Sequence, residues 1–498
     1  MHPEPSLEAY ARFLRTPFDD QVAARADRDP AEAALGIFRD AAARVPAYRQ
    51  FLRDAGVDPA AVRSPDDFRR LPLTTKVGYF QRHPLAALCR NGDLRGAHTI
   101  ALSSGSTGEP TPWPRALADE LVVAARFEQV FHDAFEADRR RTLAVVCFPL
   151  GTWVGGMYTT ACCRHLAAKG YPIVTVTPGN QRPEIFRVVR TLAPFFEQTV
   201  LLGYPPFVKD VVDAGIVDGI DWRALAIKLV LAGEVFSEEW RALMGERAGL
   251  TRPLCDSASL YGTADAGVLG NETPVTVAIR RFLADRPDAA RALFGEGRLP
   301  TLAQYDPHDR FFEEHEGTLV VTGDGQVPLV RYHISDRGGV MAYDDLVGRM
   351  RELGLDAEAE ARRAGARALR RLPFVYVFGR SHFAVSYYGA NIFPEMVSVG
   401  LEQPEVRAWV TGKFVMEVRE DEARDRQLFV AVELAPGVTG TDEMQQRIAA
   451  SILHHLLRLD SEFASYVPPE RRPPRVTLWP AGDPAYFPVG VKHRYSRS

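Results

Sequence analysis

Residues 142–150 read TLAVVCFPL, and three more short apolar runs follow: PIVTVTP (172–178), TVLLGYP (199–205) and IKLVLAG (227–233). The segments between these runs carry apolar residues at helical spacing. Strands that alternate with helices are typical of a largely parallel sheet whose faces are covered by helices. This region therefore predicts an α/β fold with covered, mostly parallel sheets.

The segments on either side of this region predict other elements. The pattern from about residue 29 to 70 is helical, with Pro46 as a break. Two later segments, EGTLVVTG (316–323) and PLVRYHISDRGGVMAY (328–343), are typical of hairpin-like β structure. Residues 354–370, GLDAEAEARRAGARALR, are rich in alanine, arginine and glutamate, which predicts a solvent-facing charged helix.

The pattern resets after Arg380. It predicts a strand at 384–389, a helix at 392–403, two strands at 406–420 and 427–435, a long helix at 442–466 and a strand at 475–481. This order is that of a compact α+β unit of normal domain size. We therefore expect a large N-terminal domain at 1–380 and a small C-terminal α+β domain at 381–498.

The composition excludes several classes of protein. The chain has 498 residues, 46% of them hydrophobic and 25% charged, with a formal net charge of −4. This balance gives no electrostatic footprint for nucleic acid, and no apolar run reaches the roughly 18–20 residues that span a bilayer. The N-terminal segment MHPEPSLEAYARFL lacks the pattern of a signal peptide. Five scattered cysteines without a C-x-x-C pair predict reduced thiols in a cytoplasmic protein without structural zinc.

One segment, LSSGSTGEPT (102–111), crowds small hydroxyl and glycine residues behind a strand-like run. Backbone N–H groups in such a turn can converge on phosphate oxygens, and the hydroxyls add donors. An ordinary surface turn has the same composition, and taken alone the composition favours the turn. The segment is not a Walker loop, because Glu109 stands where that loop would benefit from a lysine.

Other candidates are scattered along the chain. In YGTADAG (261–267), Tyr261 can stack on a purine and Asp265 can bind Mg²⁺, although a Gly/Asp turn has the same pattern. Asp336 is predicted to end a strand, where a carboxylate can accept ribose hydroxyl hydrogen bonds or simply face solvent. Arg380 suits a ribose or phosphate contact or an interdomain salt bridge. Lys492 follows Pro488 and Gly490, so it is either a point charge for phosphate or a tail residue.

The order of these motifs resembles the adenylate-forming superfamily of acyl-coenzyme A synthetases, adenylation domains and luciferases. Within it, the phenylacetate–coenzyme A ligase family is the most similar. The segments that carry the resemblance are AAARVPAYRQFLRDAGVDPAAVRSPDDFRRLPLTTK (41–76), SSGSTGEPT (103–111), LAGEVFSEEW (231–240), YGTADAG (261–267), EGTLVVTG (316–323), PLVRYHISD (328–336) and GRSHFAVSYYGANIFPE (379–395).

The resemblance implies that ATP and a carboxylate form an acyl-AMP and pyrophosphate, and that the acyl group then passes to a thiol, usually that of coenzyme A. It also implies a mobile C-terminal domain. The nucleotide-binding residues would be Ser103, Ser104, Gly105, Ser106, Thr107 and Gly108 at the phosphates, Gly233, Glu234, Tyr261, Gly262 and Thr263 at the adenine side, and Asp336 and Arg380 at the ribose. Asp265 would bind Mg²⁺. Lys492 would be catalytic, at the carboxylate and α-phosphate.

The acid-binding pocket is expected from four aromatic residues that have glycines beside them. These residues are Trp153, Tyr158, Tyr204 and Phe207. Their chemistry favours a small aryl or other flat apolar carboxylate, and plain core packing is the alternative for each of them.

Five departures from the family pattern leave alternatives open. Glu109 replaces a lysine, Ala264 replaces a hydroxyl residue and Asp265 replaces glutamate. Residues 382–383 replace two acids, and Lys492 comes one position late. Coenzyme A is the expected acceptor, with an amine, a carrier-protein thiol or an inorganic nitrogen nucleophile as alternatives. A catalytically inactive nucleotide-binding sensor is the alternative from another class. The expected partner is a small carboxylate, with no nucleic acid or membrane, and a homodimer is compatible with the sequence.

Overall fold

The computed structural model describes residues 5–25, 28–102, 111–152, 154–233, 236, 238–295, 299–380, 385–392, 394–401, 403–420, 424–487 and 496. The described residues form two compact units. The larger unit comprises those up to 102 and those at 112–203 and 211–380. The smaller unit comprises residues 111 and 204–210 and the described residues from 385 onward.

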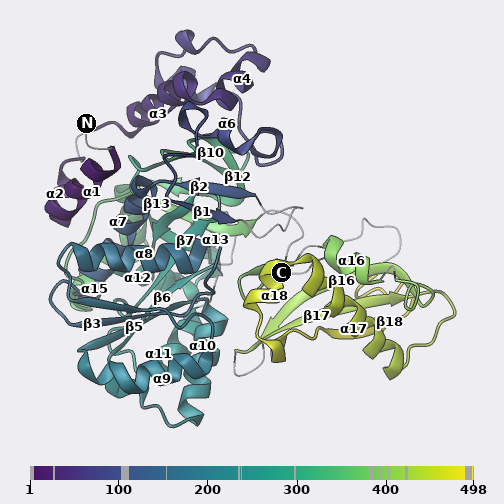
Figure 1. Cartoon of the computed structure of the whole chain (residues 1–498). Helices are drawn as coiled ribbons and strands as arrows, with labels where there is room; N and C mark the ends of the chain where they lie inside the picture. Colours follow the sequence, from purple (N-terminus) through teal and green to yellow (C-terminus); the bar gives the residue numbers. More distant parts are fainter. Residues whose placement is uncertain are drawn as a thin grey trace. The chain divides into compact units, whose positions relative to one another are not determined.

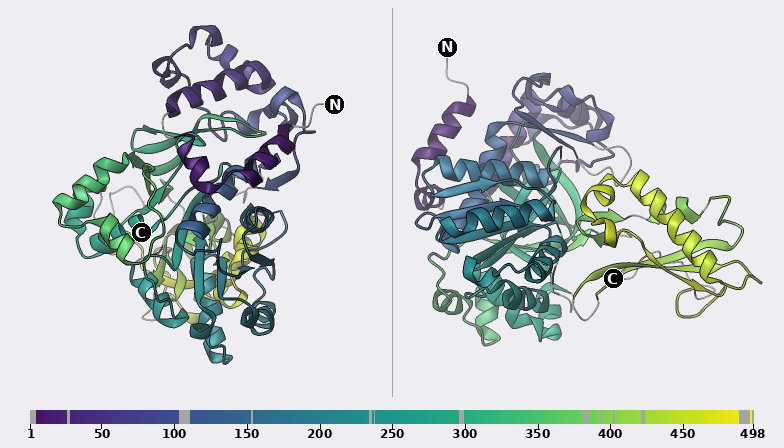
Figure 2. Two further views of the ribbon diagram at one scale, coloured as in Figure 1. Left: turned by 90° about the vertical axis from the view of Figure 1, so that its left-hand side faces the viewer. Right: turned by 60° about the horizontal axis from the view of Figure 1, so that its bottom comes forward.

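An eleven-stranded sheet organises the larger unit, in the order β10-β11-β12-β13-β9-β8-β7-β6-β5-β3-β4. The last five strands pair in parallel. They are β7 (Ser257–Thr263), β6 (Ile227–Ala232), β5 (Gln198–Gly203), β3 (Thr142–Val146) and β4 (Ile173–Val176). Helices α8 (Val154–Ala168), α9 (Arg182–Leu192), α10 (Pro205–Val217) and α11 (Glu238–Ala248) connect them. The predicted strand–helix alternation is therefore confirmed, and Figures 1 and 2 show helices packed along this sheet.

The other half of the sheet is antiparallel. Its strands are β8 (Gly267–Asn271), β9 (Thr301–Gln304), β10 (Arg310–His315), β11 (Thr318–Gly323), β12 (Leu329–Met341) and β13 (Phe374–Arg380). The β structure expected at 316–343 is confirmed. The expectation that Asp336 ends a strand is wrong, because β12 continues to Met341. Asp336 pairs with Arg380 across a long stretch of sequence, so local pattern does not reveal this partner.

The N-terminal segment contains six helices, and the last four of them share a core with the antiparallel half of the sheet. They are α1 (Pro5–Arg15), α2 (Phe18–Ala23), α3 (Pro30–Arg44), α4 (Pro46–Asp54), α5 (Pro65–Arg69) and α6 (Leu85–Leu88). The predicted break is confirmed, because Val45 separates α3 from α4 and Pro46 begins the second helix. Phe38 and Phe68 share a buried core with residues of β10–β12 such as Leu319 and Tyr332. This core holds the 71–80 segment close to β12.

A further set of helices and a short hairpin completes the larger unit. They are β1 (Thr99–Leu102), β2 (Pro112–Arg115), α7 (Leu117–Asp133), α12 (Pro274–Ala284), α13 (Pro287–Phe294), α14 (Tyr343–Glu352) and α15 (Ala357–Arg363). The helix expected at 354–370 is shorter than predicted, because Gly365 adopts a φ of 88° just after it ends. It is also not wholly solvent-facing, since Ala357 and Ala361 are buried in a core cluster.

The smaller unit has the predicted α+β order. Its elements are β14 (Val385–Tyr387), β15 (Ala390–Ile392), α16 (Pro394–Leu401), β16 (Val410–Glu420), β17 (Arg426–Leu434), α17 (Asp442–Leu459), α18 (Ser461–Tyr466) and β18 (Arg475–Trp479). The long helix expected at 442–466 divides at Asp460, whose carboxylate accepts the N–H of Phe463 and starts α18. Across the described part of the chain, no helix has the length and apolarity needed to cross a bilayer.

Candidate active site

Two tyrosine–aspartate pairs lie between β7 and β12 of the larger unit. The Tyr261 hydroxyl donates a hydrogen bond to Oδ2 of Asp336 at 2.7 Å. The Tyr332 hydroxyl donates to Oδ2 of Asp265 at 2.5 Å. All four side chains are buried, with exposed fractions of 3–8%. The predicted stacking, metal-binding and ribose-binding residues of this unit are therefore brought together.

Sheet order alone would keep these pairs apart, because β13, β9 and β8 lie between β12 and β7. A side-chain hydrogen bond between β7 and β12 therefore requires this part of the sheet to curve strongly. The left-handed backbone of Ser335, with a φ of 66°, lies immediately before Asp336. Non-glycine residues rarely adopt this conformation. It changes the direction of the chain just before Asp336 and so changes where the Asp336 carboxylate lies.

Two buried arginines hold the turn that carries Asp265. Nη2 of Arg115, at the end of β2, donates to the carbonyl oxygens of Ala264 at 2.8 Å and Asp265 at 2.6 Å. Nη2 of Arg310 donates to the carbonyl oxygen of Ala266 at 3.1 Å. Burial lowers the pKa of Arg310, although the aspartates nearby oppose this effect. Three successive carbonyl groups are thus fixed by guanidinium groups, which places the Asp265 side chain rigidly.

Sequence reasoning missed Lys76 as a site residue. Its Nζ lies 3.8 Å from Oδ1 of Asp265, and its side chain is 18% exposed. Thr74 fixes this segment to β12, because its N–H donates to the Arg331 carbonyl and its own carbonyl accepts the His333 N–H. Its hydroxyl also donates to the carbonyl of Val330. The available signal was that Lys76 is one of only six lysines in the chain and ends one of the family segments.

The expected base-binding segments begin at neighbouring strand ends. Ala232, the last residue of β6, is the register partner of Leu260 on β7, so Gly233 follows the end of β6 beside the point where Tyr261 continues β7. The Tyr261 ring lies nearly parallel to that of Phe312, with 6.5 Å between centroids. Phe312 therefore supports one face of the ring.

Gly262 and Thr263 have structural roles in the same turn. A Cβ at Gly262 would lie 2.7 Å from the Gly267 carbonyl oxygen, so only glycine allows this close pairing of β7 and β8. The Thr263 hydroxyl accepts the N–H of Ala266 at 3.0 Å. Both residues shape the turn around Asp265.

Several predicted residues lie outside the described residues. They are Ser103, Ser104, Gly105, Ser106, Thr107, Gly108, Trp153, Glu234 and Lys492, together with residues 109 and 382–383. The backbone of Arg380 is described, and its position on β13 is opposite Asp336. The flanks of the Lys492 segment are anchored on neighbouring positions of β16: Phe487 packs with Val415, and Ser496 bridges to Met416.

The predicted acid-pocket residues divide between the two units. Tyr158 on α8 is buried beside the Asp265 turn, because a Cβ on Gly267 would lie 3.4 Å from its Cε2. The Arg115 guanidinium lies 6.0 Å from the centre of the Tyr158 ring. Tyr204 and Phe207 belong to the smaller unit, where the Tyr204 ring lies 4.9 Å from that of Tyr466. For Tyr158, Tyr204 and Phe207 alike, the substrate-binding role stays a prediction.

The donor set around Asp265 fits a Mg²⁺ ion that arrives with phosphate. Among the described residues no group of three or more histidine, cysteine, aspartate or glutamate side chains could hold a metal. Mg²⁺ typically uses one or two protein carboxylates and completes its shell with phosphate oxygens and water. A single buried carboxylate, oriented by Tyr332, is such a ligand.

Comparisons with known proteins give two distant sequence relatives. A search of family models finds no match. The chain is 24% identical over 433 residues to a phenylacetate–coenzyme A ligase of Aromatoleum evansii, covering 84% of each chain. It is 25% identical over 370 residues to the corresponding ligase of Thermus thermophilus, covering 73% of this chain and 72% of that one.

The fold matches solved structures over its full length. A 2-hydroxyisobutyryl-coenzyme A ligase in complex with 2-HIB-AMP and coenzyme A gives a TM-score of 0.60 at 15% identity, covering 100% of this chain and 94% of that one. An open conformation of the same ligase gives 0.53 at 15% identity, covering 100% and 96%.

The fold of this chain is the adenylate-forming ligase architecture of these solved structures. Among the proteins of that architecture, its sequence relatives are phenylacetate–coenzyme A ligases. The resemblance expected from the sequence motifs is thereby confirmed.

Proposed function

We propose that this chain is an ATP-dependent, AMP-forming ligase that activates a small aromatic carboxylate and transfers the acyl group to coenzyme A. The observation that carries the proposal is the buried cluster of Tyr261, Asp336, Tyr332 and Asp265, with Lys76 beside it. Tyr261 comes from β7, Asp265 from the turn after it, Tyr332 and Asp336 from β12, and Lys76 from the segment beside β12. Each has the chemistry that one part of a nucleotide requires.

The nucleoside would be held by Tyr261 and Asp336. The Asp336 carboxylate accepts hydrogen bonds from the ribose hydroxyls, and the Tyr261 hydroxyl orients that carboxylate. The Tyr261 ring stacks on adenine, with Gly233 and Glu234 along the base edge. Residues 103–108 wrap the phosphates, and Arg380 binds near the ribose.

Adenylation brings two anions together, because a carboxylate attacks the α-phosphate. Positive charge and fixed donors around the reacting atoms lower this barrier. When bound, Mg²⁺ would supply such charge, and Asp265 is the residue that would hold it. Lys76 adds a second cation at the same carboxylate, and Lys492 neutralises the acid and the α-phosphate.

The acid and the acceptor are proposed from the sequence relatives and from an aromatic residue beside the site. The relatives are phenylacetate–coenzyme A ligases, and Tyr158 is a buried aromatic residue beside the Asp265 turn. Both favour an aromatic acid, and the relatives favour coenzyme A as the acceptor. Domain 381–498 would carry Lys492 and move between the two half-reactions.

Acid-dependent exchange of labelled pyrophosphate into ATP tests the proposal. Phenylacetate and benzoate are expected to support exchange better than 2-hydroxyisobutyrate, and product analysis with coenzyme A is expected to show the acyl thioester. ATP binding without exchange for any acid would contradict the ligase and favour a nucleotide-binding sensor. Exchange without thioester would contradict coenzyme A as the acceptor.

A further inference from the structure

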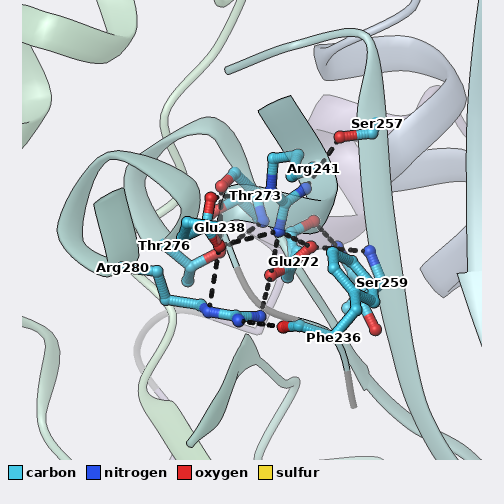
Figure 3. Close-up of polar contacts among 10 residues, drawn as sticks. Phe236, Glu238, Arg241, Ser257, Ser259, Glu272, Thr273, Thr276 and Arg280 are labelled. Carbon is cyan, nitrogen blue, oxygen red and sulfur yellow. Dashed lines mark hydrogen bonds and ion pairs between the residues drawn. The ribbon is translucent and has the colours of Figure 1, made fainter. Parts of the chain in front are cut away.

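Four charged side chains form a buried cluster beside β7 and β8 (Figure 3). They are Glu238 and Arg241 on α11, Glu272 just after β8, and Arg280 on α12. Nη2 of Arg241 donates to both carboxylate oxygens of Glu272, at 2.8 and 2.9 Å. Its Nε donates to Oε2 of Glu238 at 2.9 Å. Nη1 of Arg280 donates to Oε1 of Glu272 at 2.9 Å, and its Nε lies 3.2 Å from Oε1 of Glu238.

The cluster also grips the backbone of two separate segments. Nη2 of Arg280 donates to the carbonyl oxygen of Phe236 at 2.7 Å. Oε2 of Glu272 accepts the N–H of Ser259 on β7 at 2.8 Å. Phe236 follows Gly233 by three positions, and Ser259 precedes Tyr261 by two. The cluster therefore joins the segment after β6 to the strand that carries Tyr261.

The cluster contains two positive and two negative side chains, so each buried charge is neutralised by its neighbours. Burial alone would raise the pKa of Glu272, but Arg241 and Arg280 outweigh that effect and hold the pKa below its ordinary value. The Phe236 ring lies beneath both guanidinium groups, 4.9 Å from Arg241 and 5.6 Å from Arg280. A buried ionic cluster adds little stability over apolar packing, and fixing one geometry is a role it can fill.

We infer that Arg280 is a positioning residue for the nucleotide base, because through Glu272 it links Phe236, three positions after Gly233, to the strand that carries Tyr261. Its guanidinium contacts neither base nor phosphate in this role. It sets the spacing of the two segments between which the base inserts. This inference rests on the proposed function, which assigns the base to Gly233 and Tyr261.

The Arg280→Lys variant tests the inference with two probes of different chemistry. Lysine keeps the positive charge, but one ammonium group does not reproduce the planar set of bonds to Glu272 and the Phe236 carbonyl. Calorimetric titration with AMP reports the base site, and titration with inorganic tripolyphosphate reports the phosphate site. We expect the dissociation constant for AMP to rise about tenfold, and that for tripolyphosphate to stay within about twofold. Arg281→Lys, at the exposed next position of α12, is the matched control and should change neither value.

Each outcome is informative. A wild-type chain that binds neither AMP nor ATP overturns the proposed function and this inference with it. Wild-type binding with equal AMP affinity in Arg280→Lys overturns the inference alone, as does an equal loss for AMP and tripolyphosphate. If circular dichroism shows that Arg280→Lys does not fold, Glu238→Gln replaces it under the same criteria, because it weakens the contact to Arg280 while retaining a polar side chain.

Discussion

The hydrogen bond between Tyr261 and Asp336 allows a prediction of defined size. Tyr261→Phe removes one hydroxyl and keeps the ring that contacts Phe312. The lost bond is 2.7 Å long and ends on a carboxylate that is 4% exposed. Hydrogen bonds to charged groups contribute about 1.5–3 kcal/mol net, so the free energy of unfolding should fall by about that amount.

Tyr48→Phe is the matched control for this variant. Tyr48 is as buried as Tyr261, but its hydroxyl finds no hydrogen-bond partner among the described residues. Removing it should leave the free energy of unfolding unchanged or raise it by up to about 1 kcal/mol, because a buried unpaired hydroxyl is unfavourable. Each variant differs from the wild type by the loss of one hydroxyl group, so the effects of changed buried area and packing on stability largely cancel when the two variants are compared.

The assay is guanidinium unfolding of both variants and the wild type, together with ATP titration. Because Tyr261 orients Asp336, the affinity for ATP should also fall, by about 3- to 10-fold, in Tyr261→Phe alone. Equal stability of Tyr261→Phe and Tyr48→Phe would show that the hydrogen bond contributes nothing. Equal ATP affinity would remove Asp336 from the ribose site.

Two further predictions concern the Asp265 turn and the smaller unit. Arg115→Met removes the donor to the Asp265 carbonyl, so the Mg²⁺ concentration for half-maximal pyrophosphate exchange should rise several-fold. Arg95→Met, at a side chain that is 93% exposed, is the control and should not change this concentration. The same Mg²⁺ dependence in Arg115→Met and the wild type would contradict the role of Arg115. Burial raises the pKa of Asp460 to about 6 from an ordinary value of 3.8, so the stability it confers is present below about pH 4 and is lost, by about 3 kcal/mol, as the pH rises through 6. Asp460→Asn should flatten this dependence in urea unfolding between pH 4 and 7, since asparagine still caps the helix, and an unchanged pH slope would refute the assignment.

Much of the fold was predictable because short-range periodicity encodes it. The alternation of apolar runs with helical segments at 142–233 predicted the parallel strands β3–β6, and Pro46 marked the break between α3 and α4. The helix at 354–370 was overestimated, because its alanine content suits a helix throughout while Gly365 ends it early. Helix propensity alone does not predict the residue at which a helix ends, because tertiary structure also determines it.

For the site, the sequence motifs predicted individual residues but not the contacts between them. Tyr261 and Asp336 were expected to bind the nucleotide and Asp265 to bind Mg²⁺, and the structure brings all three into one buried cluster. The hydrogen bonds of Asp336 to Tyr261 and of Asp265 to Tyr332 depend on the curvature of the sheet. The position of Lys76 depends on contacts between segments that are distant in the sequence. Arg280 was missed for the same reason, because its partners lie on other helices and strands.

The most direct test of the account is acid-dependent pyrophosphate exchange measured side by side for the wild type, Asp265→Asn and Asp66→Asn. Asp66 is an exposed control, with 79% of its side chain accessible. The account predicts that Asp265→Asn lowers the exchange rate at least about 100-fold, because it removes the charge that holds Mg²⁺ at the phosphates, and that Asp66→Asn leaves the rate unchanged. An exchange rate in Asp265→Asn equal to that of the wild type would contradict the claim that this buried cluster is a nucleotide-activating site.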